Sequence, residues 1–260
     1  MPPMYLFVYL VLGLLGLILG SYFNSWIWRV HEWRRVWNRR SICVHCEKQL
    51  VWYDNIPVIS FAWLKGKCRH CHGSIPAHYL LVELATPLFF IAVAVHYFIL
   101  PEFSAWQFFR DLFFSAFFIV VFMYDYLYFE ILPPLMWMAS AIAFGINYFF
   151  LQISLLSLLF GILIGGGFFL LQYLVSRGRW IGSGDIHLGI LLGALLGWEE
   201  VLVALFIAYV VGALVGLGLL VTRKKKMQSE LPFGTFLAVG GWVAMLWGSQ
   251  IVAWYVGLIR

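Results

Sequence analysis

Charged residues are scarce in this chain, and their scarcity excludes most classes of soluble protein. Asp, Glu, Lys and Arg make up 11% of the 260 residues, whereas 63% are hydrophobic and 19% are aromatic. A soluble domain of this composition would have to cover its surface with apolar side chains. A regular alternation of apolar and polar residues is also missing, which argues against a transmembrane β-barrel. The sequence therefore predicts an all-α polytopic membrane protein.

Long apolar runs predict about eight transmembrane helices, since a helix needs roughly 20 apolar residues to cross a membrane. The first run has no Lys or Arg before Arg29, so we expect a membrane helix there and not a cleaved signal peptide. We expect three segments: a first transmembrane helix (1–28), a polar segment (29–78) and a membrane domain (79–260). The expected spans are 6–28, 79–100, 108–128, 132–151, 154–176, 185–198, 201–221 and 233–257.

Positive charge is missing from one side of the expected topology. Of the 17 Lys and Arg residues, 15 fall in the loops after the first, fifth and seventh spans. The positive-inside rule makes these loops cytoplasmic and places both termini outside. The sequence pI near 9.0 then reflects topology. We therefore expect membrane lipid as a partner and no nucleic acid.

Cysteine is scarce as well, and all four cysteines lie in segment 29–78, in the motifs CVHC and CRHC. Two CxxC pairs can bring four thiolates to one tetrahedral Zn²⁺, although the 21 residues between Cys46 and Cys68 slightly exceed the usual spacing of about 15–20. Two disulfides are the alternative, but a cytoplasmic loop keeps its thiols reduced. We expect a small zinc-ribbon-like domain with structural zinc, because four thiolates leave no open coordination position. The expected ligands are Cys43, Cys46, Cys68 and Cys71, with His45, His70 and His72 as possible competitors.

Aspartate occurs only four times, and Asp185 stands at the start of an apolar run in WIGSGDIHLG. Only 14 residues, 185–198, separate this point from Glu199. At 1.5 Å per residue they span roughly 21 Å, short of a hydrocarbon core of about 30 Å. The Gly-Ser-Gly entry is therefore expected at membrane depth, where non-helical backbone is tolerated only against protein or a water-filled cavity. The alternative is a helix N-cap, in which the carboxylate accepts backbone N–H groups.

A second aspartate, Asp125, lies near the end of the third expected span. The predicted topology places both Asp125 and Asp185 at the cytoplasmic end of the membrane. Two carboxyl groups at one depth can share a proton, so that one activates water and the other polarises a carbonyl, as in an aspartic protease. The same pair suits ion or proton transport, and the residues alone leave both interpretations open. Asp111 and His96 are expected near the outer face and solvated.

Motifs along nearly the whole chain then resemble one family, the bacterial type IV prepilin peptidases, which belong with the GxGD intramembrane aspartic proteases. The double CxxC, YDNIP and GxGD occur in the same order as in that family. The matching stretches are GSYFNSWIWRV (20–30), WYDNIPVISF (52–61), LVELATP (81–87), YD (124–125), GSGDIHLG (182–189) and LPFGTFLAVG (231–240), beside the cysteine motifs.

The resemblance implies an activity, a substrate and a location. The family removes the short basic leader from type IV prepilins and pseudopilins at the cytoplasmic face of the bacterial inner membrane. Its two catalytic aspartates correspond to Asp125 and Asp185. Many members with the cysteine loop also N-methylate the new terminal residue with S-adenosylmethionine, which implies a methyltransferase role for 29–78 without identifying cofactor-binding residues. An ion-coupled transporter and a non-enzymatic assembly factor for pili or secretion stay open as alternatives.

Three positions depart from the family pattern. His187 stands where Lys is usual, Thr235 stands where PFGP has its second proline, and the run Glu130 to Pro134 replaces a Pro-Asp pair. None of them removes a catalytic acid, so we expect an active enzyme. Glu83 is a further carboxylate at the membrane edge, for which contact with the leader, a role in methyl transfer and simple snorkelling are all open.

Overall fold

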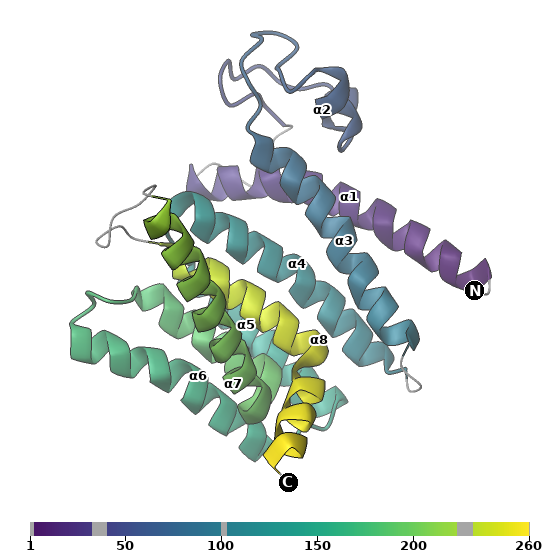
Figure 1. Ribbon diagram of the computed structural model, residues 1–260. Coiled ribbons are helices and arrows are strands. Elements are labelled where there is room, and N and C mark those ends of the chain that lie inside the picture. The colour runs from purple at the N-terminus through teal and green to yellow at the C-terminus, as the bar shows by residue number, and fades with distance from the viewer. Residues whose placement is uncertain (1–2, 33–40, 100–102, 223–230, 260) are drawn as a thin grey trace. The chain divides into compact units, whose positions relative to one another are not determined.

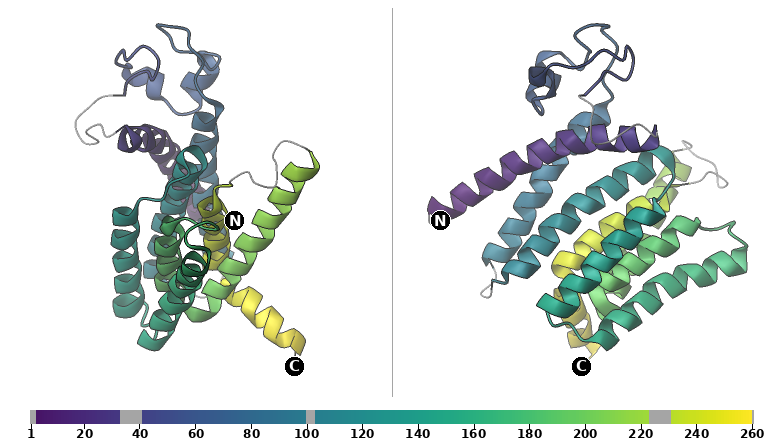
Figure 2. Two further views of the ribbon diagram at one scale, coloured as in Figure 1. Left: turned by 90° about the vertical axis from the view of Figure 1, so that its left-hand side faces the viewer. Right: turned by 180° about the vertical axis from the view of Figure 1, so that it is seen from behind.

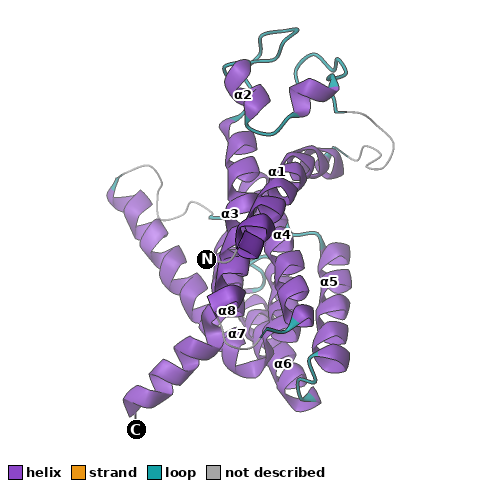
Figure 3. Ribbon diagram, turned by 90° about the vertical axis from the view of Figure 1, so that its right-hand side faces the viewer, coloured by secondary structure: helices purple, strands orange, loops and turns teal. Residues whose placement is uncertain are grey.

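The computed structural model describes residues 3–32, 41–99, 103–222 and 231–259. The described chain is helical, and its only strand-like pairs are two isolated bridges (Figure 3). It divides into two compact units, Met1–Phe103 and Ser104–Arg260. The predicted basic loops lie partly outside the described residues, namely at Arg34, Arg35, Arg39, Arg40, Arg223, Lys224, Lys225 and Lys226.

The first unit holds two long helices, α1 (Pro3–His31) and α3 (Ala77–Ile99), which cross one another (Figure 1). Gly20 of α1 allows a close approach to the backbone of α3, and the side-chain amide of Asn24 donates to the carbonyl of Tyr79 at 2.9 Å. The cysteine segment lies between the two helices in sequence. It contains the 3₁₀ turn η1 (Trp52–Asn55) and the short helix α2 (Ile59–Trp63).

The second unit is a helical bundle centred on α7, which packs against α5, α6 and α8, while α4 packs against α8 (Figure 2). Its buried core is mainly Phe, Leu, Ala and Val. The elements are α4 (Ala105–Tyr128), α5 (Pro133–Gly145), the π-helical turn η2 (Ile146–Phe150), α6 (Leu155–Ser176), α7 (Ser183–Val221) and α8 (Phe233–Ile259).

The prediction of about eight membrane helices was wrong in its count: six described helices are long and apolar enough to cross a membrane. The expected span 132–151 is divided between the 13-residue α5 and η2. The two expected spans 185–198 and 201–221 fall on either side of a break at Gly197 in the 39-residue α7, which counts once among the six. Apolar runs report composition, whereas helix ends depend on hydrogen bonds that the composition of these runs does not reveal. The all-α architecture itself is confirmed.

Helix α7 is two straight segments that meet at Gly197 (Figures 1 and 2). Gly197 has φ 79° and ψ −174°, a conformation that is open to glycine and strained for other residues. The first segment runs antiparallel to α6, and the second runs back along α8 until Gly216 approaches Leu231. Because Leu231 and Asp185 line one cavity, both ends of α7 lie at the same end of the unit.

The break at Gly197 frees backbone carbonyls, and Asn147 binds two of them. Its amide nitrogen donates to the carbonyls of Ala194 at 2.9 Å and Leu195 at 2.7 Å, and its amide oxygen accepts an N–H from Arg110 at 2.7 Å. The expectation that Asp111 is solvated was wrong: it is 0% exposed and paired with Arg110 at 2.7 Å. A helix break inside a membrane protein needs such a polar cluster to satisfy its backbone.

Replacing Asn147 with leucine should destabilise the second unit while keeping the size of the side chain. Two carbonyls and one guanidinium N–H would lose their partner, at a cost of about 1–3 kcal/mol for each buried group left unsatisfied. Thermal unfolding in detergent measures the effect. Gln250→Leu removes an exposed amide from α8 and serves as the control. Equal melting temperatures for the two variants would refute this role of Asn147.

Candidate functional site

Asp125 lies at the end of α4, in its last turn. The helix ends because Phe129 adopts a left-handed conformation (φ 56°) and its N–H donates to the carbonyl of Asp125 at 2.8 Å. The Asp125 carboxyl group is turned into the unit and the residue is only 5% exposed. Its Oδ2 accepts the backbone N–H of Thr235 at 2.8 Å, in the first turn of α8.

Asp185 occupies the first turn of α7, three residues after the N-cap Gly182. Its Oδ2 accepts the backbone N–H of Gly182 at 3.3 Å, so the carboxylate does contribute to the helix cap. The positive end of the helix dipole favours a carboxylate at this point. The residue is 6% exposed. Capping fixes the orientation of the side chain and leaves its other oxygen available for chemistry.

The two aspartates line the same cavity, of about 270 Å³. A buried water needs roughly 10–15 Å³ of such space, so the cavity admits several waters. The wall is mostly loop backbone and apolar side chains. The remaining lining residues are Phe129, Ile131, Gly178, Arg179, Trp180, Ile181, Gly182, Gly184, Leu231, Pro232 and Phe233.

Ile131 closes the cavity by packing against glycines from two different helices. A Cβ on Gly184 would lie 2.7 Å from the Cβ of Ile131, and one on Gly234 would lie 2.9 Å from Oδ2 of Asp125. Only glycine fits at both positions. Ile131 and Gly234 were not predicted as site residues, although Gly234 lies in the motif LPFGTFLAVG.

The departures His187 and Thr235 have different surroundings. His187 does not line the cavity; its Nδ1 lies 3.0 Å from the carbonyl of Ser183, and its ring lies 5.4 Å from that of Trp137. Thr235 touches the site directly through its backbone N–H, and its hydroxyl donates to the carbonyl of Pro232 at 2.6 Å. A proline at this position has no N–H to donate.

The four cysteines form a second constellation, in the first unit. Their sulfur atoms all lie within 4.8 Å of one another, and those of Cys43 and Cys71 are 3.9 Å apart. A tetrahedral zinc with bonds of about 2.3 Å requires sulfur atoms about 3.8 Å apart, so the set fits this ion. The thiols are free, not paired in disulfides. No histidine joins the cluster among the described residues, and a ring nitrogen of His45 instead lies 3.1 Å from the carbonyl of Ser74.

Each cysteine pair lies on the same kind of turn. The N–H of Cys43 donates to Lys48 and that of Cys68 donates to Gly73, both at 2.9 Å. The N–H of His70 also points at the Cys68 sulfur, at 3.5 Å. Burial raises the pKa of the Cys68 thiol, but hydrogen bonds from the backbone N–H groups of Cys71 and His70 and from the thiols of Cys43 and Cys71 together lower its pKa to about 7. A thiolate, the form that binds metals, is thereby favoured near neutral pH.

Glu83 is buried on α3, at 9% exposure. Its Oε2 accepts the N–H of Val58 at 2.7 Å, which ties the cysteine segment to the helix. The side chain therefore does not snorkel away from the protein.

Comparisons with known proteins cover most of the chain. Residues 14–97 match the family described as bacterial peptidase A24 N-terminal domain, and residues 112–217 match the type IV leader peptidase family. A relative from Stutzerimonas stutzeri is 34% identical over 95% of this chain and 93% of its own. Relatives from Aeromonas hydrophila and Pseudomonas aeruginosa are 33% and 32% identical over 84% and 94% of this chain, and over 74% and 91% of their own. All three are named prepilin leader peptidase/N-methyltransferase. No solved structure matches the chain.

Replacing Cys43 with serine should remove the metal that the cluster holds. Wild type is expected to contain about one zinc per chain, and the variant should lose most of it because a hydroxyl is a poor substitute for a thiolate. Metal analysis of the purified protein measures the content. Val44→Ser, within the same turn, is the control. Undiminished zinc in the Cys43 variant would show that the metal binds elsewhere.

Proposed function

This chain belongs to the type IV leader peptidase family, and on that premise we propose that it cleaves the leader peptide from type IV prepilins or pseudopilins. The observation that carries the proposal is the cavity that Asp125 and Asp185 share: both residues are buried, and the cavity is large enough for water. Peptide hydrolysis by an aspartic dyad needs these features and no metal ion at the dyad.

In the proposed mechanism the two carboxyl groups hold one proton between them. The ionised group takes a proton from a water in the cavity as that water attacks the scissile carbonyl. The protonated group donates to the carbonyl oxygen, where negative charge develops. The N–H groups of Thr235 and Gly182 orient Asp125 and Asp185 by binding one oxygen of each. The roles of acid and base belong to the pair.

The chain is a multi-pass membrane protein. We place it in the bacterial cytoplasmic membrane, with the aspartates and the cysteine segment on the cytoplasmic side, because Lys and Arg gather in the loops at those positions. A basic leader would then meet the active site before export. Prepilin and membrane lipid are the partners this arrangement requires, and nucleic acid has no part in it.

The name of the relatives supports a second reaction, N-methylation of the new pilin N-terminus. S-adenosylmethionine supplies the methyl group in such reactions. We assign this activity to the first unit, where four cysteines would hold zinc in a structural role. Four thiolates complete the coordination of the ion, so it would shape the domain without taking part in catalysis.

A cleavage assay with Asp125→Asn and Asp185→Asn tests the dyad. Purified enzyme in detergent and a prepilin with a basic leader should give a shorter product on a gel. Each variant should cleave at least about 100-fold more slowly, because it loses the general acid or base. Glu130→Gln, which removes an exposed carboxylate near the end of α4, is the control. Cleavage without a membrane gradient excludes a transporter; normal cleavage by either variant would refute the dyad.

Substituting Gly184 with alanine should slow cleavage without touching a catalytic group. The new methyl group would overlap Ile131, so the start of α7 must shift and move Asp185 with it. We expect a fall of about 10- to 100-fold in kcat, since misplacement of about 1 Å costs on that order. Gly257→Ala, where an added Cβ meets nothing within 4 Å, is the matched control. Unchanged kcat in the Gly184 variant would contradict the packing argument.

A further inference from the structure

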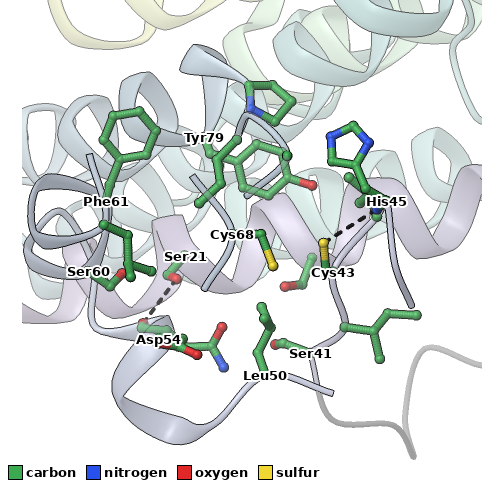
Figure 4. Close-up of a pocket in the computed structure, with 18 of the residues that line it drawn as sticks. Ser21, Ser41, Cys43, His45, Leu50, Asp54, Ser60, Phe61, Cys68 and Tyr79 are labelled. Atoms are coloured by element: carbon green, nitrogen blue, oxygen red, sulfur yellow. Dashed lines mark hydrogen bonds between the residues drawn. The ribbon is translucent and has the colours of Figure 1, made fainter. Parts of the chain in front are cut away.

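The first unit contains its own cavity, of about 110 Å³, distinct from that of the aspartates. Three parts of the unit form its wall: Ser21 and Arg29 from α1, the cysteine segment, and Tyr79 and Glu83 from α3. Figure 4 shows Asp54 and Ser21 on one side of the cavity and Cys43 on the other. This space is too small for a whole nucleoside, but it suits one polar end of a ligand.

Asp54 supplies the feature that points to a ligand. Its side chain is 2% exposed, and its Oδ1 accepts two N–H groups of Arg69, at 2.9 and 2.8 Å. Its Oδ2 is the one buried side-chain N or O atom without a hydrogen-bond partner among the described residues. A buried carboxylate oxygen without a donor costs free energy, so a donor group from a ligand would stabilise it.

The other charges of the cavity narrow the class of ligand. The carboxylate of Glu83 and the buried guanidinium of Arg29 line the same space as Asp54. Arg69 lines it as well and is already paired with Asp54, so two acids and two bases are present. This set suits an amino-acid end, whose ammonium group meets a carboxylate and whose carboxylate meets a guanidinium. The rings of Phe61 and Tyr79 add apolar and aromatic surface, which also favours a cation.

We propose that Asp54 Oδ2 binds a primary ammonium group during methyl transfer, and that this group is the amino-acid end of S-adenosylmethionine. The inference rests on the proposed methyltransferase function. The new N-terminus of the cleaved pilin carries the same chemical group, so the test must tell the two sources apart. Arg69 is a positioning residue here, because it holds Asp54 through the opposite oxygen.

Binding of S-adenosylmethionine to the full-length protein in detergent, measured by equilibrium dialysis, tests the proposal. Asp54→Asn keeps an acceptor for Arg69 and puts an NH₂ donor in place of Oδ2, so affinity should fall about 10- to 100-fold. Methylthioadenosine lacks the amino-acid end, so the substitution should not change whatever affinity it has for the protein. Glu32→Gln removes an exposed carboxylate of the same unit and should change neither affinity.

The second arm of the experiment measures binding of a pilin peptide, with either a free or an acetylated N-terminus, to wild type and to Asp54→Asn. A loss in the variant that is confined to the free-amine peptide would keep the ammonium site and assign it to the pilin. Equal affinities of wild type and variant for both ligands would overturn the site. So would equal affinities of wild type for S-adenosylmethionine and methylthioadenosine, a comparison that needs no variant.

Two further measurements distinguish a failure of the Asp54 ammonium site from a failure of the proposed methyltransferase function. Prepilin cleavage and zinc content should be normal in Asp54→Asn, which shows that the fold is intact. A wild type that cleaves prepilin but neither binds S-adenosylmethionine nor methylates its product would refute the methyltransferase function, and the inference with it.

Discussion

The hydrogen bonds from Asn147 to the carbonyls of Ala194 and Leu195 are the interaction on which the second unit depends. They satisfy backbone groups that the break at Gly197 removes from the helical ladder. Without a polar partner at this point, a chain in an apolar environment would have to continue as an unbroken helix. The break allows α7 to begin and end at one end of the unit. It therefore brings Leu231 and the start of α8 to the cavity that Asp185 lines.

The candidate active site is assembled from helix ends. Asp125 closes α4, Asp185 opens α7, and the first turn of α8 reaches Asp125 through Thr235. Helix N-termini carry unsatisfied N–H groups, which are suitable donors for carboxylates. The same groups that would otherwise be left unpaired in an apolar medium thus hold the acids in place. The cavity follows from this design, since mostly loop segments meet where the helices stop.

The sequence predicted well those features that depend on residue type and spacing. Two CxxC motifs were enough to anticipate a four-sulfur cluster, and the order of spans was enough to expect Asp125 and Asp185 at one depth. It could not predict features that depend on contacts between distant segments. Asp111 looked like a solvated outer-face residue because the sequence does not show that its neighbour Arg110, with which it pairs, is itself buried and bound to the distant Asn147. Ile131 has no distinctive chemistry, and its role emerges only from the two glycines it covers.

In the cysteine segment, Arg69 connects the second CxxC motif to the carboxylate of Asp54, which lies earlier in the sequence. Arg69 lies between Cys68 and Cys71, inside the second CxxC turn, and its guanidinium holds Asp54. Whatever loosens that turn also releases Asp54, whose Oδ2 is buried and has no hydrogen-bond partner among the described residues. Under the proposed division of activities between the two units, oxidation of the thiols would therefore uncouple the two halves of pilin maturation. Leader removal would continue in the second unit, and pilins would be exported with unmodified amino termini.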